Sequence, residues 1–449
     1  MIRVGAMSHR RKPIPQNPVE VEITGLSHDG RGIARQDNKV MFVFGALPGE
    51  TVNAKFTRCH SRYSEATTVD VINQASTRVV PKCEHFGLCG GCQLQHLAPS
   101  SQILHKQKML EEQLVNQAKV TPEEWLPPLV STPFGYRQKA RLGVRFVEKK
   151  DALLIGFREQ GNNKIAIIEG CEVLDPRVGS RIKELRDLIN SLEGKMHIPQ
   201  IEIAIGEEEV ALVFRHLAPL SEQDIAALTT FCERFHFSLY LQPQGVDSVH
   251  KIWPVNSSLA LRYVLKDQQL TYHFHPLDFT QVNQEINQQM VNQALTLLNP
   301  SSNDSILDLF CGLGNFSLPF AQKAHDVVGV EGTAQMVARA TENARNNQLT
   351  NIEFHACDLS KDFAEQSWAK KQYTKIVLDP PRCGAEEIVN QISRFNVKEI
   401  LYISCNPATF ARDAAILVHQ HGFSLAKVGV MDMFPHTAHV ETMGLFRKP

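Results

Sequence analysis

The chain has 449 residues, of which 43% are hydrophobic and 21% charged, and its formal net charge is −1. This composition is typical of a soluble globular protein, and the length predicts two or three domains. No run of eighteen apolar residues is present, and the basic first residues lack the apolar segment of a signal peptide. These features argue against a membrane-spanning or secreted protein, so we expect a cytoplasmic one. Met7 is a second candidate for the natural start, which would make residues 1–6 a leader.

A net charge near zero argues against a uniformly basic nucleic-acid binder, but local charge is uneven. Residues 1–80 hold 11 Lys and Arg against 7 Asp and Glu, and residues 136–164 hold 8 against 3. Such basic patches suit a surface that follows a phosphate backbone. A solvated basic face without a partner is an equally good interpretation of charge alone.

The N-terminal region alternates apolar and polar residues in short runs. These runs predict strands at residues 19–26, 39–46, 51–59 and 65–73, separated by turn signals. We expect a small β-barrel over residues 15–75. The spacing of Gly25, Gly30, Gly32, Gly45 and Gly49 resembles the TRAM domain, an OB-like RNA-binding barrel. Without that resemblance, a purely structural barrel would be as consistent with the pattern.

Three cysteines then stand close together in a loop rich in glycine. Cys83, Cys89 and Cys92 lie within ten residues, as tight wrapping of a metal centre requires. A reducing compartment disfavours disulfides, so residues 76–98 are expected to bind metal. Three thiolates require a fourth ligand, which spacing alone does not identify, and four thiolates would hold zinc as well as an iron–sulfur cluster.

The middle of the chain, residues 99–274, is expected to form a connecting helix and a separate domain. Apolar residues recur with a helical period from Ser100 to Lys119, and the proline-rich stretch 121–128 ends that helix. Residues 129–274 mix strands and helices, and the basic segment Tyr136–Arg141 lies near the start of this region. We expect this α+β domain to bind RNA together with the barrel.

Residues 275–449 alternate strands and helices more regularly. Five strand–helix units follow residue 305, and two strands close the chain without a helix between them. This order predicts a parallel, doubly wound sheet with a final antiparallel strand, which is a Rossmann-like α/β domain.

Polar residues and glycines follow these strands, where such sheets bind ligands. The first strand is followed by Phe310 and a glycine loop that ends at Asn315, the second ends in Glu331, and Asp358 follows the third. On the loop and Glu331 alone, a dinucleotide dehydrogenase would be a serious alternative. The fourth strand, however, ends in Asp379-Pro-Pro-Arg, a motif typical of methyltransferases.

A cysteine follows the fifth strand. Cys405, in Ser404-Cys-Asn-Pro-Ala-Thr409, lies where reacting groups collect, and a helix beginning near Thr409 is expected to favour its thiolate. A thiolate that adds to C6 of uracil makes C5 nucleophilic, and a base must later remove the C5 proton. Glu441 is the candidate base, with His436 and His439 as weaker alternatives.

Four segments together resemble the RNA uracil-5 methyltransferase family, and the resemblance covers nearly the whole chain. They are Phe279-Thr-Gln281-Val-Asn283, Leu378-Asp-Pro-Pro-Arg-Cys-Gly384, Ser404–Thr409 and Met433–Glu441. The barrel and the cysteine set resemble the branch of this family that modifies 23S ribosomal RNA.

The resemblance implies S-adenosylmethionine as methyl donor, with Cys405 as nucleophile and Glu441 as base. It implies six cofactor contacts: Gln281, Phe310, Asn315, Glu331, Asp358 and Asp379. It also implies a 4Fe-4S cluster held by Cys83, Cys89, Cys92 and Cys171. The expected partner is a single-stranded or loop uridine of 23S ribosomal RNA, without a membrane or an obligate protein partner. Three alternatives stay open: methylation of another ribosomal or transfer RNA uridine, a dinucleotide-dependent iron–sulfur oxidoreductase, and an RNA-binding assembly factor with an idle site.

Overall fold

The computed structural model describes residues 14–448, so the candidate starts Met1 and Met7 lie outside the described part. The chain forms two compact units. The first comprises the chain up to Gly87 with Cys92–Gln102 and His436–Ala438, and the second comprises Leu88–Gly91, Ile103–Pro435 and His439–Pro449. The domain boundary expected at residue 275 falls inside the second unit and stays a prediction. No helix among the described residues is long and apolar enough to cross a membrane.

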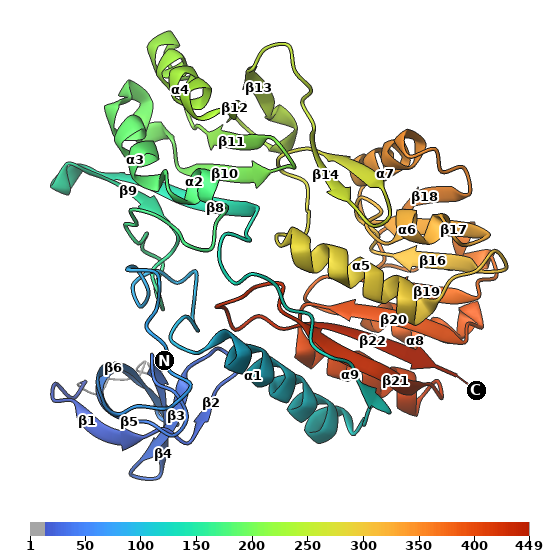
Figure 1. Cartoon of the computed structure of the whole chain (residues 1–449), viewed down its shortest axis with the longest axis horizontal. Coiled ribbons are helices and arrows are strands. Elements are labelled where there is room, and N and C mark those ends of the chain that lie inside the picture. The colour runs from blue at the N-terminus through green and yellow to red at the C-terminus, as the bar shows by residue number, and fades with distance from the viewer. Residues whose placement is uncertain (1–13, 449) are drawn as a thin grey trace, which may run out of the picture. The chain divides into compact units, whose positions relative to one another are not determined.

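The first unit contains a six-stranded sheet around its own small core (Figure 1). Alternate side chains of the strands point inward, among them Val21, Met41, Val43 and Val52. All four expected strands are present, but β3 was missed because it buries only a glycine and an alanine. The strands are β1 (Val19–Glu22), β2 (Gly25–Leu26), β3 (Gly32–Gln36), β4 (Lys39–Phe44), β5 (Thr51–Cys59) and β6 (Tyr63–Asn73), in the order β1-β5-β6-β4-β3-β2.

The expected connecting helix is present as α1 (Pro99–Glu112), continued by the π-helical turn η1 (Gln113–Ala118). Its apolar side chains, including Ile103, Leu110 and Leu114, pack into the core of the C-terminal sheet. We predict that the proline-rich stretch after it only ends the helix, but the stretch also forms a strand. It contains β7 (Glu124–Trp125), which pairs in parallel with β21 and extends that sheet by one strand.

The middle region is a six-stranded mixed sheet with helices, as expected. A core of branched aliphatic side chains joins α3 and α4 to the sheet, whose order is β13-β12-β11-β10-β8-β9. The elements are β8 (Lys139–Val147), η2 (Glu148–Lys150), β9 (Ala152–Gly156), α2 (Pro176–Gly179), α3 (Ile182–Ser191), η3 (Glu193–His197), β10 (Gln200–Ile205), β11 (Val210–Arg215), α4 (Glu222–Phe235), β12 (Phe237–Gln242), η4 (Val246–Ser248) and β13 (His250–Trp253).

An antiparallel hairpin, β14 (Leu261–Leu265) and β15 (Leu270–Phe274), and the helix α5 (Gln284–Leu298) follow. The buried side chains of both belong to the core of the C-terminal sheet. Asn283 caps α5 by accepting a hydrogen bond from the amide of Ile286.

The C-terminal sheet has eight strands in the order β18-β17-β16-β19-β20-β22-β21-β7. β22 is antiparallel to both of its neighbours, β20 and β21, as predicted for the final strand. The elements are β16 (Ser305–Leu309), α6 (Ser317–Ala321), β17 (Asp326–Glu331), α7 (Ala334–Asn346), β18 (Ile352–Ala356), η5 (Trp368–Lys370), β19 (Lys375–Leu378), α8 (Glu386–Asn390), η6 (Ile392–Phe395), β20 (Glu399–Ser404), α9 (Pro407–His419), β21 (Ser424–Met431) and β22 (Glu441–Arg447).

Both faces of this sheet are covered. Along β20, Ile400 and Tyr402 face the core that contains α1, α8 and α9, whereas Leu401 and Ile403 face the core that contains α5 and the hairpin. This explains why the strands are continuous apolar runs rather than alternating ones. The expected fold class, a barrel, a mixed α+β region and a Rossmann-like α/β sheet, is confirmed.

Candidate active site

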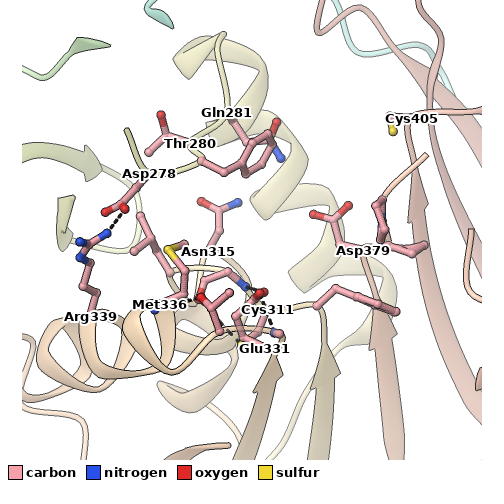
Figure 2. Close-up of a pocket in the computed structure, with 18 of the residues that line it drawn as sticks. Asp278, Thr280, Gln281, Cys311, Asn315, Glu331, Met336, Arg339, Asp379 and Cys405 are labelled. Carbon is pink, nitrogen blue, oxygen red and sulfur yellow. Dashed lines mark hydrogen bonds and ion pairs between the residues drawn. The ribbon is translucent and has the colours of Figure 1, made fainter. Parts of the chain in front are cut away.

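The carboxyl ends of the parallel strands open onto a cavity of about 1030 Å³. All eight residues predicted as cofactor contacts, nucleophile or base line it: Gln281, Phe310, Asn315, Glu331, Asp358, Asp379, Cys405 and Glu441. In the view of Figure 2, Asp379 lies between Cys405 on one side and Gln281, Asn315 and Glu331 on the other. A cavity of this size can hold a nucleoside-sized ligand and a second group beside it.

The glycine loop after β16 turns sharply beneath the cavity. Gly314 has a φ of +85°, and a Cβ there would lie 2.4 Å from the Cδ1 atom of Leu318, so only glycine fits. The carboxylate of Glu331, at the end of β17, accepts hydrogen bonds from the amides of Gly312 (3.0 Å) and Gly332 (2.7 Å). These bonds fix the orientation of Glu331 at the cavity wall.

Asn315 is held by residues that the sequence did not indicate. It exchanges two hydrogen bonds with Asn287 of α5, at 3.1 and 2.8 Å, and accepts a third from the Tyr263 hydroxyl at 3.1 Å. Tyr263 stacks on Tyr272, whose hydroxyl donates to the carbonyl of Gly314 at 3.2 Å. The hairpin therefore braces the glycine loop, and only the pairing of β14 with β15 brings the two tyrosines together.

Asp358 and Gln281 are two further predicted cofactor contacts that line the cavity. Asp358 is exposed after β18, where Ser360 and Lys361 bind its carboxylate and lower its pKa to about 2. Gln281 follows Asp278, which forms an ion pair with Arg339 of α7 (Figure 2). Neither Asp278 nor Arg339 was predicted.

Cys405 follows β20, directly before the helix α9. Asn406 caps α9 by accepting a hydrogen bond from the amide of Ala408 at 3.1 Å. We expect the helix to favour the thiolate, but the surroundings of Cys405 as a whole act in the opposite direction. Burial, and then the carboxylates of Glu441 and Asp379, raise the pKa of the Cys405 thiol to about 11, although Arg382 acts in the opposite direction.

Glu441 is the first residue of β22 and shares the cavity with Cys405. Burial and the charge of Asp379 raise its pKa to about 8, and Arg382 and Lys106 oppose that increase. Burial also raises the pKa of Asp379 to about 7. No other described residue donates a hydrogen bond to the side-chain carboxylate of Glu441 or Asp379, so both are available to a ligand.

The two histidines proposed as alternatives differ in position. His439 lines the cavity, where burial and the guanidinium of Arg382 lower its pKa to about 4; an Arg382 nitrogen lies 3.1 Å from its Nδ1 atom. A neutral imidazole with this pKa is a weak base at pH 7. His436 is buried in the first unit against Gln102 and does not line the cavity.

The four cysteines predicted as metal ligands do not form a recognisable metal site. Cys83 and Cys92 belong to the first unit, and Cys89 and Cys171 belong to the second. Among the residues that the structure describes, no group of three or more His, Cys, Asp or Glu side chains is arranged so that it could hold a metal ion. The amide of Gly91 donates to the sulfur of Cys89 at 3.4 Å, which is an interaction that stabilises thiolates.

Comparison with known proteins finds a family and full-length relatives for this chain. The family model described as tRNA (Uracil-5-)-methyltransferase matches residues 100–448, and the TRAM domain model matches residues 18–69. A protein of Hahella chejuensis named 23S rRNA (uracil(1939)-C(5))-methyltransferase RlmD is 50% identical over 98% of this chain and 100% of its own length. A protein of the same name from Alcanivorax borkumensis is 51% identical over 98% of this chain and 99% of its own.

A solved structure shares the fold. The tRNA (uracil-54, C5)-methyltransferase of Pyrococcus abyssi, in complex with S-adenosyl-L-homocysteine, aligns with a TM-score of 0.72 at 23% identity, over 95% of this chain and 100% of that one. With a family model over most of its length and full-length relatives at about half identity, the chain belongs to the tRNA (uracil-5-)-methyltransferase family.

Proposed function

We propose that the chain transfers a methyl group from S-adenosylmethionine to carbon 5 of a uracil in 23S ribosomal RNA. The relatives from Hahella chejuensis and Alcanivorax borkumensis are named for uracil 1939, and we propose the same target. One observation carries the chemistry: Cys405 and Glu441 line the same cavity as the glycine loop and Glu331. Such a substrate implies a cytoplasmic location, and no obligate protein partner is required.

The cavity wall fits S-adenosylmethionine. In this proposal Glu331 accepts hydrogen bonds from the ribose hydroxyls and Asp358 meets the adenine, with Phe310, Met336 and Leu359 as apolar neighbours in the cavity wall. Gln281, Asn315 and Asp379 line the remainder of the site. When bound, the cofactor supplies a methyl group on a positively charged sulfur.

Cys405 and Glu441 have complementary roles in this proposal. The Cys405 thiol releases its proton to solvent and its sulfur bonds to C6, while the C5–C6 π electron pair moves to C5. C5 then takes the methyl group, whose bond to the sulfonium sulfur breaks, so that S-adenosylhomocysteine is left. Glu441 next removes the C5 proton. The C5–H electron pair re-forms the double bond, and the sulfur leaves C6. A buried carboxyl whose pKa is near 8 is suited to proton transfer at neutral pH.

RNA that carries 5-fluorouracil at the target tests the mechanism. Fluorine cannot leave C5 as a proton does, so the wild-type protein should form a covalent complex that survives denaturing electrophoresis when the cofactor is present. Cys405→Ala should form none. The matched control is Cys383→Ala, which removes another thiol that lines the cavity and should keep the adduct. An adduct with Cys405→Ala, or its loss with Cys383→Ala alone, would overturn the assignment of the nucleophile.

The dinucleotide oxidoreductase is disfavoured by the family, but it has a direct test. Binding of NAD in preference to S-adenosylhomocysteine, measured by calorimetry, would support it. An idle assembly factor would leave target RNA unmethylated in a radiolabelled-methyl assay and would tolerate Cys405→Ala in cells.

We also propose that Cys83, Cys89, Cys92 and Cys171 hold a 4Fe-4S cluster. The support is the cysteine and glycine spacing and the family resemblance, together with the amide donor to the Cys89 sulfur. Protein purified without oxygen should contain about four iron and four sulfide per chain. Cys171→Ser should lose the iron, whereas Cys59→Ser should keep it. Zinc in place of iron in the anaerobic protein would contradict the cluster.

We further propose that the barrel and the middle sheet hold the RNA around the target uridine. The support is the TRAM match over residues 18–69 and the basic residues of both regions.

A further inference from the structure

Lys106 is a buried cation next to the proposed catalytic base. Its side chain, on α1, is fully buried. The ammonium donates hydrogen bonds to the Oδ1 atom of Asp432 at 2.6 Å and to the carbonyl oxygen of Phe434 at 3.0 Å. Asp432 is itself almost fully buried, so both charges of this ion pair lie inside the protein.

The position of the ion pair connects it to Glu441. Asp432 directly follows Met431, the last residue of β21, and Met431 is the residue that faces Glu441 in the antiparallel pairing of β21 with β22. The Tyr136 hydroxyl donates to the carbonyl of Pro435 at 3.0 Å, so the chain beyond Asp432 is held at a second point. Lys106 is therefore bound to the strand end beside the base.

Four other titratable or charged groups surround this carboxyl. Asp379, after β19, carries a negative charge, and Arg382 beyond it carries a positive one; Cys405, after β20, shares the cavity. His439 precedes it on the chain and is neutral at pH 7. Lys106 is the only cation from α1 among the charges that act on Glu441, and its effect opposes that of Asp379.

Stability alone gives a weak reason for this ion pair. Removing two charges from water costs several kcal/mol per ion, and apolar residues of the same size often stabilise a core equally well. A charge kept under these conditions needs another role, and favouring the ionised form of a carboxyl that must accept a proton provides one.

We propose that Lys106 is a positioning residue for proton removal: its ammonium holds the Asp432–Phe434 segment beside Glu441 and supplies a countercharge that favours the ionised form of Glu441. The inference rests on the proposed function, in which Glu441 removes the C5 proton. Lys106 does not line the cavity, so it would act through the Asp432–Phe434 segment and its charge.

Three variants separate this role from packing. Lys106→Met removes the charge and keeps the length of the side chain, but it leaves Asp432 buried without its cation. Lys106→Met with Asp432→Asn removes both charges, so thermal stability should return toward that of the wild type. Lys108→Met, at an exposed position of the same helix, is the matched control.

In the double variant, turnover should remain at least about tenfold below that of the wild type, although thermal stability returns. The pH profile of turnover should shift to higher pH, because Glu441 without its countercharge ionises at higher pH. Target RNA with deuterium at C5 should give a larger isotope effect on turnover than in the wild type, and covalent RNA–protein complex should accumulate with ordinary uracil.

A double variant that regains both stability and turnover, with an unchanged isotope effect, would show a packing role only and would overturn the proposal. Measurements on the wild-type protein distinguish this result from a failure of the proposed function. If wild-type protein neither methylates the RNA nor forms an adduct with 5-fluorouracil RNA, then the reaction itself is wrong and the role of Lys106 fails with it.

Discussion

Glu441 differs from a surface carboxylate because burial and the charge of Asp379 raise its pKa to about 8. A carboxyl with a pKa near the working pH is suited to proton transfer. We predict that Glu441→Gln still allows Cys405 to add to the base and C5 to be methylated, but blocks removal of the C5 proton. Ordinary target RNA should then remain covalently bound, and turnover should fall by about 10²- to 10⁴-fold. Denaturing electrophoresis with labelled RNA checks this, and release of methylated RNA at the wild-type rate would contradict it.

Asp379 gives a prediction about stability. Burial raises its pKa from 3.8 to about 7, so the folded state binds its proton more tightly than the unfolded state does. Its contribution to stability therefore falls as the pH rises from about 4 to about 7 and stays low above that range. Asp379→Asn should increase the free energy of unfolding at pH 8 by about 1 to 2 kcal/mol, after allowance for solvent access, and by much less at pH 4.

Urea unfolding at the two pH values measures this difference for Asp379→Asn. The same variant should lose methyl transfer, because Asp379 lines the cavity beside Cys405. An equal gain in stability at both pH values would show that ionisation of Asp379 is not the cause.

The candidate site was predicted from sequence where its residues follow strands. Cys405, Asp379 and Glu331 each stand at the end of an apolar run, and parallel strands bring such positions to one edge. Lys106 and Tyr263 could not be found in this way, because each lies far along the chain from its partner and only the packing of α1 or of the hairpin brings them together. The direction in which the pKa of Cys405 shifts could not be predicted, because the sequence does not show how deeply the thiol is buried or which carboxylates face it.

At the scale of elements, the hairpin β14–β15 supports the cofactor loop. The Tyr263 hydroxyl donates to Asn315, so Tyr263→Phe should remove one hydrogen bond worth about 1 kcal/mol. We predict roughly fivefold weaker binding of S-adenosylhomocysteine, measured by calorimetry. Tyr373→Phe is the matched control, because the Tyr373 hydroxyl bonds to the carbonyl of Trp368 at 2.7 Å and does not line the cavity. Equal losses in the two variants would mean a general loss of stability.

Some strands could be predicted from the sequence, and others could not. The five parallel strands from β16 to β20 alternate with helical segments, and all except β18 are mainly apolar, so their pattern identifies them. β3 and β7 are short and contain few apolar residues, and β7 lies among prolines that predict a loop. The two residues of β7 form a strand only because they pair with the edge strand β21. Such pairing depends on tertiary structure, so the local sequence does not predict it.

At the scale of the whole molecule, the distribution of charge matters more than its sum. The basic segment at the start of the middle region is mostly engaged within the protein. Arg141 forms an ion pair with Glu202, and the ammonium of Lys139 donates to the carbonyl of Asp278, where burial lowers the pKa of Lys139 to about 8. Counting charges along the sequence therefore overestimates the number of cations available to RNA.

Arg145, four residues beyond this segment on β8, is a cation that remains available. It is exposed on β8, two positions beyond Gly143 on the same face as Arg141, and it forms no ion pair with any residue in the described part of the chain. We predict that Arg145→Gln weakens RNA binding several-fold at low salt and reduces the slope of log affinity against log salt by about 0.7 to 1, because one phosphate contact is lost. Affinity for S-adenosylhomocysteine should not change.

Filter binding at several salt concentrations measures the slope. Lys323→Gln, which changes an exposed lysine after α6, is the control because it alters the net charge by the same amount. A slope that falls equally in both variants would show that RNA responds to total charge rather than to a contact at Arg145.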